Sequence, residues 1–246
     1  MIKELEDYNW FPAALRRWQL QFVGNVSVWT KLYQPLSPVL QQMILKNKIT
    51  ALQDTCSGSG MPAVYLQQQL SANMPMLLTD KYPLRGFKNK PGVIYSPDPV
   101  DVLEMRPASN TVYTMYNAFH HFTTVQQQAW LKKMAASKTC FLIGEILTPG
   151  FFNLVKILFT TTLLQLLTAP FVKPFSLARL FFTYIIPLNL FTVTYDGIIS
   201  VIRSKTEKGY CDLLQDISDP LYSITIHTIK NRKGDLVYIK GEPVNT

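Results

Sequence analysis

The stretch Asp54-Thr55-Cys56-Ser57-Gly58-Ser59-Gly60 (DTCSGSG) decides the fold class of this chain. It follows the short apolar run ITALQD, which is typical of a buried strand, and precedes MPAVYLQQQL, in which Pro62 suits a first helical turn. Glycines at a strand-to-helix turn let the backbone approach a ligand closely, and the free N–H groups at the helix start favour a negatively charged group. The stretch predicts a ligand-binding βα turn, with a tight turn that binds nothing as the alternative.

Outward from this turn, strand-like runs alternate with helical runs. The runs MPMLLTD, GVIYS, TVYTMYN and TCFLIGEIL predict four more strands, and VQQQAWLKKMA predicts a helix. LYSITIHTIK and LVYIKGEP, separated by the turn NRKGD, predict an antiparallel hairpin at the end of the chain. We therefore expect an α/β fold with a seven-stranded, mostly parallel sheet and helices on both faces.

The chain divides by composition into two parts. Residues 1–48 are helical and rich in aromatic side chains, which predicts an N-terminal helical cap. Residues 49–246 carry the sheet, with a hydrophobic helical insertion at about 151–191. Two runs in and after the insertion, residues 157–172 and 180–195, hold no charge over 16 residues each, short of the roughly 20 that span a bilayer.

Prolines also interrupt the insertion, at Pro170, Pro174 and Pro187. We expect it to form a buried helix or a lid over a pocket, or to make a peripheral membrane contact, rather than to cross a membrane. Its flanking cations are candidates for contact with anionic lipid; they are Lys156, Lys173 and Arg179.

Charge and cysteine content narrow the function classes. The 246 residues carry a formal charge of +8, but the Lys and Arg residues are scattered, which makes nucleic acid an unexpected partner. The three cysteines, Cys56, Cys140 and Cys211, lie far apart without CxxC spacing, so we expect neither a disulfide framework nor a metal site. The acidic N-terminus MIKELEDYNWF lacks an apolar signal core, and we expect a cytoplasmic protein.

The residues around the glycine turn indicate the ligand class. Asp80 ends the next strand, 20 residues after Gly60, where an acid can accept hydrogen bonds from ribose hydroxyls. Gly58-x-Gly60-x-x-Ala63 also satisfies a relaxed dinucleotide fingerprint, which leaves a nicotinamide-dependent reductase open. The fifty or so residues before the first strand, the closing hairpin and the run NAFHHF after the fourth strand favour S-adenosylmethionine.

DTCSGSG, LLTD, PVD, YNAFHHF and the hairpin together resemble the Rossmann-like (class I) S-adenosylmethionine-dependent methyltransferase superfamily, from Ile49 to the C-terminus. EDYNWFP…LRR and YDGIISVIRS resemble a bacterial subgroup of that superfamily. The resemblance implies roles for these cofactor-binding residues: Asp54 with Cys56, Ser57, Gly58 and Gly60 at the methionine end, Asp80 at the ribose, Asp101 and Val102 at the adenine, and Asn117 near the sulfonium. Cys56 departs from the family, because it stands where the first glycine is usual and should avoid a positive φ.

Several residues are candidates for the acceptor side. His120 and His121 have the near-neutral pKa of a general base, or they cap and pack a helix start instead. Glu145, at the end of the fifth strand, is expected to orient a loop. The candidate acceptor-binding residues are Trp10, Phe11 and Tyr33, as an apolar cap with residues 151–191, and Tyr195, Asp196 and Arg203, where Asp196 starts a helix that positions Arg203 or forms an ion pair.

Three functions remain besides the reductase. The favoured one is an S-adenosylmethionine-dependent methyltransferase that acts on a small, largely apolar acceptor. A nucleic-acid methyltransferase is disfavoured because Asn117 is followed by Ala-Phe rather than by Pro-Pro and an aromatic residue. A non-catalytic binding protein with a methyltransferase fold is kept open by Cys56 and by the lack of a clear base. The acceptor and the oligomeric state stay open.

Overall fold

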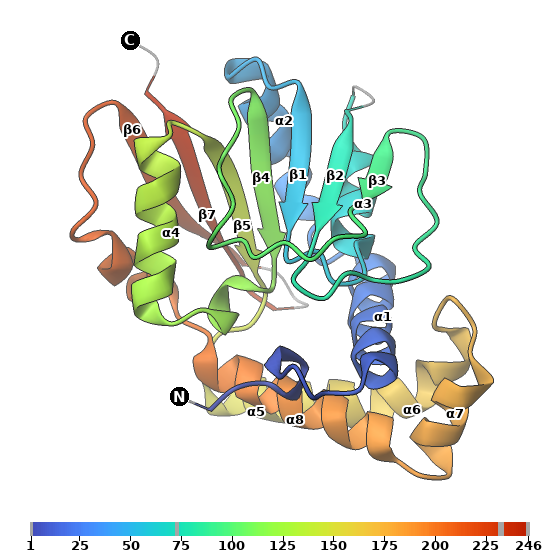
Figure 1. The fold of residues 1–246 in the computed structure, drawn as a ribbon. Helices are drawn as coiled ribbons and strands as arrows, with labels where there is room; N and C mark the ends of the chain where they lie inside the picture. The colour runs from blue at the N-terminus through green and yellow to red at the C-terminus, as the bar shows by residue number, and fades with distance from the viewer. Residues whose placement is uncertain (1, 72–73, 231–233, 245–246) are drawn as a thin grey trace.

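A seven-stranded sheet forms the centre of the molecule (Figure 1), in the strand order β3-β2-β1-β4-β5-β7-β6. The computed structural model describes residues 2–71, 74–230 and 234–244. The strands are β1 (Ala51–Thr55), β2 (Met76–Thr79), β3 (Val93–Tyr95), β4 (Thr111–Tyr116), β5 (Cys140–Glu145), β6 (Tyr222–Ile229) and β7 (Leu236–Pro243). The first five pair in parallel, and β7 pairs antiparallel with both β5 and β6. The predicted sheet and hairpin are confirmed; residues 231–233 of the expected turn NRKGD lie outside the described residues.

Helices cover both faces of the sheet, as predicted. On one face, α2 (Ser37–Lys46) and α3 (Met61–Gln67) bury Leu40, Met43 and Val64 against the strands. On the other face, α4 (Thr124–Ala136) buries Trp130, and α9 (Glu207–Cys211) with its following turn (Asp212–Leu214) buries Tyr210. All six residues of β5 are buried, because both faces of this central strand are covered.

A layer of helices lies across the carboxyl ends of the parallel strands (Figure 1). We call α5, α6, α7 and α8 with their connecting turns the platform. Its elements are α5 (Phe151–Phe159), a π-helical stretch (Thr160–Leu164), α6 (Gln165–Thr168), a 3-10 turn (Ala169–Phe171), α7 (Leu177–Tyr184) and α8 (Leu188–Arg203). By length and composition alone, the continuous helix Phe151–Phe171 could cross a membrane, and so could α7 and α8 if this pair, bent by 77°, formed one span.

The platform differs from the sequence expectation in the length of its first helix. This helix begins at Phe151, six residues before the uncharged run 157–172, so it spans 21 residues and ends at Phe171, next to Pro170. A proline cannot donate to the carbonyl four residues earlier, and here the hydroxyl of Tyr184 donates to Leu166 instead. Pro187 does lie at a break, between α7 and α8, as predicted.

The N-terminal residues connect the sheet to the platform. After the 3-10 turn η1 (Leu5–Asp7), α1 (Ala13–Trp29) runs beside the glycine turn, where a Cβ on Gly24 would lie 2.1 Å from the Ser59 hydroxyl. The chain then passes through η2 (Gln34–Leu36) into α2, which packs on the sheet face rather than over its edge. The domain boundary at residue 48 stays a prediction.

Candidate functional site

A cavity of about 600 Å³ lies between the carboxyl ends of the strands and the platform. Its volume is in the range of small-molecule sites. One part of the wall comes from the strand ends and includes Ser57, Asp80, Asn117 and His121. Another part comes from α1 and the platform and includes the apolar side chains of Phe22, Val26, Ile157, Leu164 and Val193, beside polar ones such as Lys156 and Asp196. The insertion therefore lies on the same side of the sheet as the glycine turn.

The glycine turn has a left-handed backbone at three positions. The φ angles are 55° at Cys56, 52° at Gly58 and 70° at Gly60. The expectation that Cys56 avoids a positive φ is therefore wrong, because the cysteine adopts the conformation that glycine normally takes there. A Cβ on Gly58 would lie 2.9 Å from Leu20 of α1, so a bulkier residue would strain the backbone and press on that helix.

Asp54 and Asp80, the two acids at the ends of β1 and β2 that were expected to bind the cofactor, occupy different positions. Asp54 is 2% exposed, lies behind the cavity wall and accepts a 2.6 Å hydrogen bond from the Thr114 hydroxyl. Burial raises the pKa of the Asp54 carboxyl to about 7. Asp80 lines the cavity and accepts hydrogen bonds of 2.8 Å from the backbone N–H groups of Gly58 and Tyr82. Asp80 thereby joins the glycine turn to the end of β2.

Asp101, Val102 and Asn117 also reach the cavity wall. Asp101 forms an exposed ion pair with Lys81 at 3.1 Å, and Val102 is buried in the core beneath the wall. Asn117 has a φ of 52°, and its backbone N–H donates to the Gly144 carbonyl at 2.7 Å. Among the described residues, the side-chain oxygen of Asn117 is buried without a hydrogen-bond partner, as expected of a group that receives a ligand.

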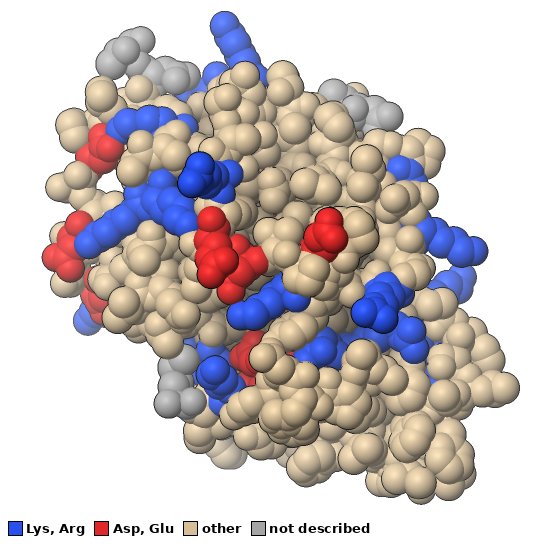
Figure 2. All heavy atoms as spheres, viewed as in Figure 1, with Lys and Arg blue, Asp and Glu red and all other residues tan. Residues whose placement is uncertain are grey.

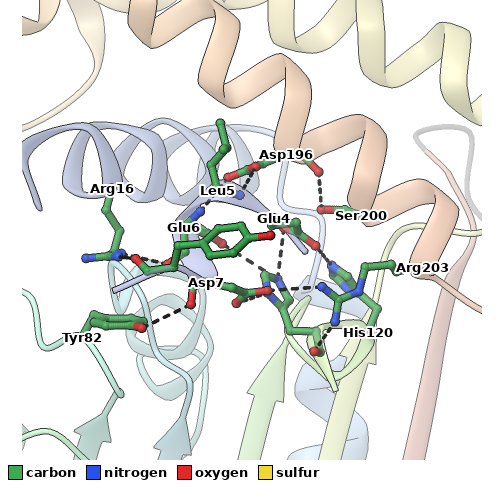
Figure 3. Close-up of polar contacts among 12 residues, drawn as sticks. Glu4, Leu5, Glu6, Asp7, Arg16, Tyr82, His120, Asp196, Ser200 and Arg203 are labelled. Carbon is green, nitrogen blue, oxygen red and sulfur yellow. Dashed lines mark hydrogen bonds and ion pairs between the residues drawn. The ribbon is translucent and has the colours of Figure 1, made fainter. Parts of the chain in front are cut away.

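Acids from the N-terminus surround the two histidines at the end of the cavity (Figure 3). We call Glu4, Glu6, Asp7, His120 and His121 the acid–histidine cluster. Nδ1 of His120 lies 2.6 Å from Glu145, and Nδ1 of His121 lies 3.0 Å from Asp7. Both Nε2 atoms face the Glu4 carboxylate, at 3.5 Å for His120 and 3.3 Å for His121.

The excess of carboxylates controls the charge of the cluster. Burial lowers the pKa of His121, but Glu4, Asp7 and Glu6 raise it to about 10 overall. Burial also raises the pKa of Glu6 to about 8, helped by its acidic neighbours. In this arrangement His121 keeps its proton at neutral pH, which does not favour the simple general base expected from the sequence. Catalysis by His120 or His121 stays a prediction.

Glu145 acts as the sequence suggested. Its carboxylate accepts a 2.7 Å hydrogen bond from the backbone N–H of Phe119 and holds the ring of His120. Both contacts fix the turn Phe119–His121 that follows β4. His120 itself is 1% exposed and lies behind the cavity wall, whereas His121 lines the cavity.

Asp196 and Arg203 hold the N-terminal segment rather than each other. Asp196 accepts from the backbone N–H groups of Leu5 (2.5 Å) and Glu6 (3.1 Å) and from the side chain of Gln19 (2.5 Å). Arg203 pairs with Asp7 at 3.2 Å and donates to the His121 carbonyl. Asp196 does not start a helix, contrary to expectation, because α8 already begins at Leu188 after Pro187.

The aromatic candidates separate into two groups. Tyr33 lines the cavity, with its ring 5.1 Å from that of Tyr116. Phe11 packs in a small core with Leu15 and Trp18, and Trp10 is 67% exposed. Tyr195 is half-buried on α8, with its ring 6.3 Å from that of Phe191. Trp10, Phe11 and Tyr195 therefore lie away from the cavity wall.

Comparison with solved structures agrees with this architecture. Human N-acetylserotonin methyltransferase is 12% identical at a TM-score of 0.50, over 91% of this chain and 55% of that one. The chain has the class I S-adenosylmethionine-dependent methyltransferase fold. Mitomycin 7-O-methyltransferase MmcR (11% identity, TM-score 0.45, 87% and 54% coverage) and an O-methyltransferase family protein from Burkholderia thailandensis (11%, 0.43, 89% and 58%) are also similar. The chain spans about half the length of these proteins.

No protein-family model and no curated protein matches the sequence. Within the methyltransferase fold, the sequence analysis missed the residues that close the cavity from the N-terminus. These residues are Glu4, Glu6, Asp7, Arg16 and Gln19, and Tyr82, after β2, donates to the Asp7 carbonyl. The acidic start ELED of an otherwise basic chain was the one available signal, because no local pattern shows that it lies beside residues 120 and 121.

Proposed function

We propose that this chain is an S-adenosylmethionine-dependent methyltransferase that acts on a small, largely apolar acceptor. The observation that carries the proposal is the cavity itself, which has a glycine turn and an acid-bearing strand end on one side and an apolar wall on the other. The methyltransferase fold brings these two halves together at the carboxyl ends of its parallel strands.

The residues of the cofactor half suit S-adenosylmethionine. Asp80 lies at the wall with its carboxylate fixed by two backbone N–H groups, so it is oriented for ribose hydroxyls. The glycine turn leaves the wall without bulky side chains, and the side-chain oxygen of Asn117 is free to accept a hydrogen bond from a ligand. S-adenosylmethionine supplies an electrophilic methyl group on a sulfonium.

The acceptor half excludes water and orients the acceptor. Phe22, Ile157, Leu164 and Val193 bind an apolar body, and the acid–histidine cluster provides the polar end of the cavity. A methyl transfer needs the acceptor atom held in line with the methyl group and relieved of its proton, and positioning supplies much of the rate. His121 is the imidazole that faces the cavity at this end.

The similar structures support the same class. The human N-acetylserotonin methyltransferase structure contains S-adenosylmethionine, and other similar proteins are O-methyltransferases. Because this chain spans about half of their length, its own acceptor has to be found by experiment.

Calorimetry with S-adenosylmethionine, its demethylated product and NADP tests the proposal. We expect the first two to bind and NADP not to bind. Asp80→Ala should weaken binding by about 1–3 kcal/mol, since it removes hydrogen bonds to a charged acceptor. Asp98→Ala, on an exposed loop, is the matched control and should leave binding unchanged. NADP binding without S-adenosylmethionine binding would contradict the proposal.

A further inference from the structure

The acid–histidine cluster has the arrangement of an open metal site. One ligand atom each from Glu4, His120 and His121 lies within 4.8 Å of the other two. Glu4 and His120 are 2% and 1% exposed, and Oε1 of Glu4 and Nε2 of His120 have no hydrogen-bond partner among the described residues. Buried polar atoms without hydrogen-bond partners are rare in native proteins, and these two lie 3.5 Å from each other.

The distances between these atoms also suit a shared cation. Four ligand atoms that surround a metal ion tetrahedrally at 2.0–2.1 Å lie about 3.3–3.4 Å from one another. The Glu4 oxygens lie 3.5 Å from Nε2 of His120 and 3.3 Å from Nε2 of His121. Oε1 of Glu6 lies 3.8 Å from the same nitrogen of His121 and is placed to become a further ligand.

The outer nitrogens of both rings are held by carboxylates. Nδ1 of His120 contacts Glu145, which is 0% exposed, and Nδ1 of His121 contacts Asp7. A carboxylate that accepts from Nδ1–H fixes the ring, and a cation that binds Nε2 takes the place of the proton held there. Two such pairs point their Nε2 atoms at one glutamate, which is the His₂–carboxylate set of open zinc and iron sites.

We propose that Glu4, His120 and His121 bind a divalent transition-metal cation, with Zn²⁺ as the probe. Imidazole nitrogens favour such ions over Mg²⁺ and Ca²⁺, which prefer oxygen. Glu4 and His121 line the cavity, so a position left open on the cation would face the acceptor. On the proposed function, a cation there would bind the acceptor's polar atom and favour loss of its proton.

Untagged protein, stripped with chelator, tests this site by Zn²⁺ calorimetry and by metal analysis after dialysis. We expect about one Zn²⁺ per chain in the native sequence. Co²⁺ should give visible absorption bands that report nitrogen and oxygen ligands. Glu4→Gln and His121→Asn should abolish stoichiometric binding, and Asp7→Asn should weaken it by about 10-fold or more.

His227→Asn is the control, because the chain holds three histidines and this one is exposed on β6. It should bind Zn²⁺ like the native chain. Absence of Zn²⁺ binding by the native chain, or unchanged binding in Glu4→Gln and His121→Asn, would overturn the site. S-adenosylmethionine binding to the same stripped protein is measured in parallel, so failure of the cation site is distinguished from failure of the proposed function.

The outer face of the platform carries a second, independent inference. Large apolar side chains are exposed along its helices and turns: Phe151, Phe152, Phe159, Leu167, Phe171, Phe175, Leu177, Ile185 and Phe191. Only 17% of the apolar window of helix Phe151–Phe171 is buried. Figure 2 shows the lower part of the molecule, where Figure 1 places α6 and α7, free of charged residues, with Lys and Arg and some Asp or Glu above it.

The charged residues of the platform indicate which kind of surface it contacts. Residues 151–202 contain four charged side chains, of which Arg179 and Asp196 are buried. The expected lipid contact of Arg179 is therefore wrong, since its guanidinium donates to Gln21, Pro174 and Val172. Lys173, in the turn before α7, remains as an exposed positive charge, whereas Lys156 lines the cavity and lies beside Gly234.

We infer that this face lies on an anionic lipid bilayer, parallel to its plane. An apolar face whose chain segment, residues 151–202, exposes lysine and no acid matches the acyl region and the headgroups of such a surface. The helix Phe151–Phe171 also forms part of the cavity wall, through Ile157 and Thr161. Both side chains pack against Gly197 of α8, where an added Cβ would lie 3.0–3.1 Å from them. If the helix Phe151–Phe171 spanned the bilayer, it would leave the cavity, and this part of the wall would be lost.

Flotation with phosphatidylcholine vesicles, with and without phosphatidylglycerol, tests this surface. We expect binding to the anionic vesicles, released by salt or by Phe152→Glu combined with Lys173→Glu. Val125→Glu is the control, because Val125 is an exposed apolar residue on α4, away from the platform. Failure to float would overturn the inference. So would resistance to carbonate extraction, which indicates a spanning helix, or a dimer in light scattering that Phe152→Glu dissociates.

Discussion

Asp54 is a single buried carboxyl that makes the stability of the chain depend on pH. Its pKa rises from 3.8 to about 7 on folding because burial disfavours its charge. The folded state therefore binds the proton more tightly, so stability contributed at low pH is lost as the pH rises from 3.8 to about 7. Asp54→Asn should remove this loss and stabilise the protein by up to about 4 kcal/mol above the window.

Urea unfolding of both proteins across this pH range measures the difference. The difference in unfolding free energy between the two proteins should be small near pH 3.8 and grow as the pH rises toward 7. Asp98→Asn, an exposed acid, should show no such growth. A stability gain of Asp54→Asn that is the same at every pH would mean that packing, and not charge, is responsible.

Single residues also show what the sequence could predict. Asp80 was placed at the cavity from spacing alone, because the end of a parallel strand fixes the position of an acid there. The backbone of Cys56 was predicted wrongly, since the general avoidance of positive φ gave way to the geometry of the turn. The acids of the N-terminus were missed because tertiary contact, not local pattern, brings Glu4 to His120.

Among the elements, the N-terminal segment is held over the cavity mainly by side chains. Asp196 accepts from Leu5, Glu6 and Gln19, and Arg16 donates to the carbonyls of Glu6 and Tyr8. Asp196→Ala leaves the backbone N–H groups of Leu5 and Glu6 without their acceptor, at about 1–3 kcal/mol for each, while Gln19 keeps its bond to Glu6. We expect hydrogen exchange at residues 5–8 to accelerate far more than exchange in the sheet.

The control for this prediction is Asp212→Ala, which removes an exposed acid after α9. It should leave exchange in the N-terminal segment unchanged. Equal acceleration of the segment and of β4 in Asp196→Ala would show that Asp196 supports the whole fold rather than the segment.

The elements of the sheet could be read from the sequence, but the platform could be read only in part. Strand runs of four to eight residues bounded by small or acidic residues have a clear signature. The helix that begins at Phe151 ends at Phe171, beside Pro170, so its end follows the proline signal. Its start was not predicted, because the expectation counted only the uncharged run 157–172 and Lys156 interrupts the apolar pattern before it.

The whole molecule is built from a well-buried sheet and a sparsely buried platform. The sheet has two large cores, one on each face. The platform is joined to α1 by a small core of Phe22, Val172 and Val193 and by the stacking of Trp18 on Phe182 at 5.7 Å. No residue of α5 is buried. Regions with few buried apolar contacts open at lower free energy than the global core.

We therefore expect the platform to unfold before the sheet. Phe22→Ala should speed hydrogen exchange across α5–α8 with little change in β1, β4 and β5, although a buried Phe→Ala change costs about 3–5 kcal/mol. Leu142→Ala, in fully buried β5, should speed exchange in both parts, because the platform needs the sheet beneath it. Anionic vesicles should slow exchange in the platform alone. Uniform acceleration by Phe22→Ala would instead mean that platform and sheet unfold as one unit, since a local opening cannot expose amides that lie outside it.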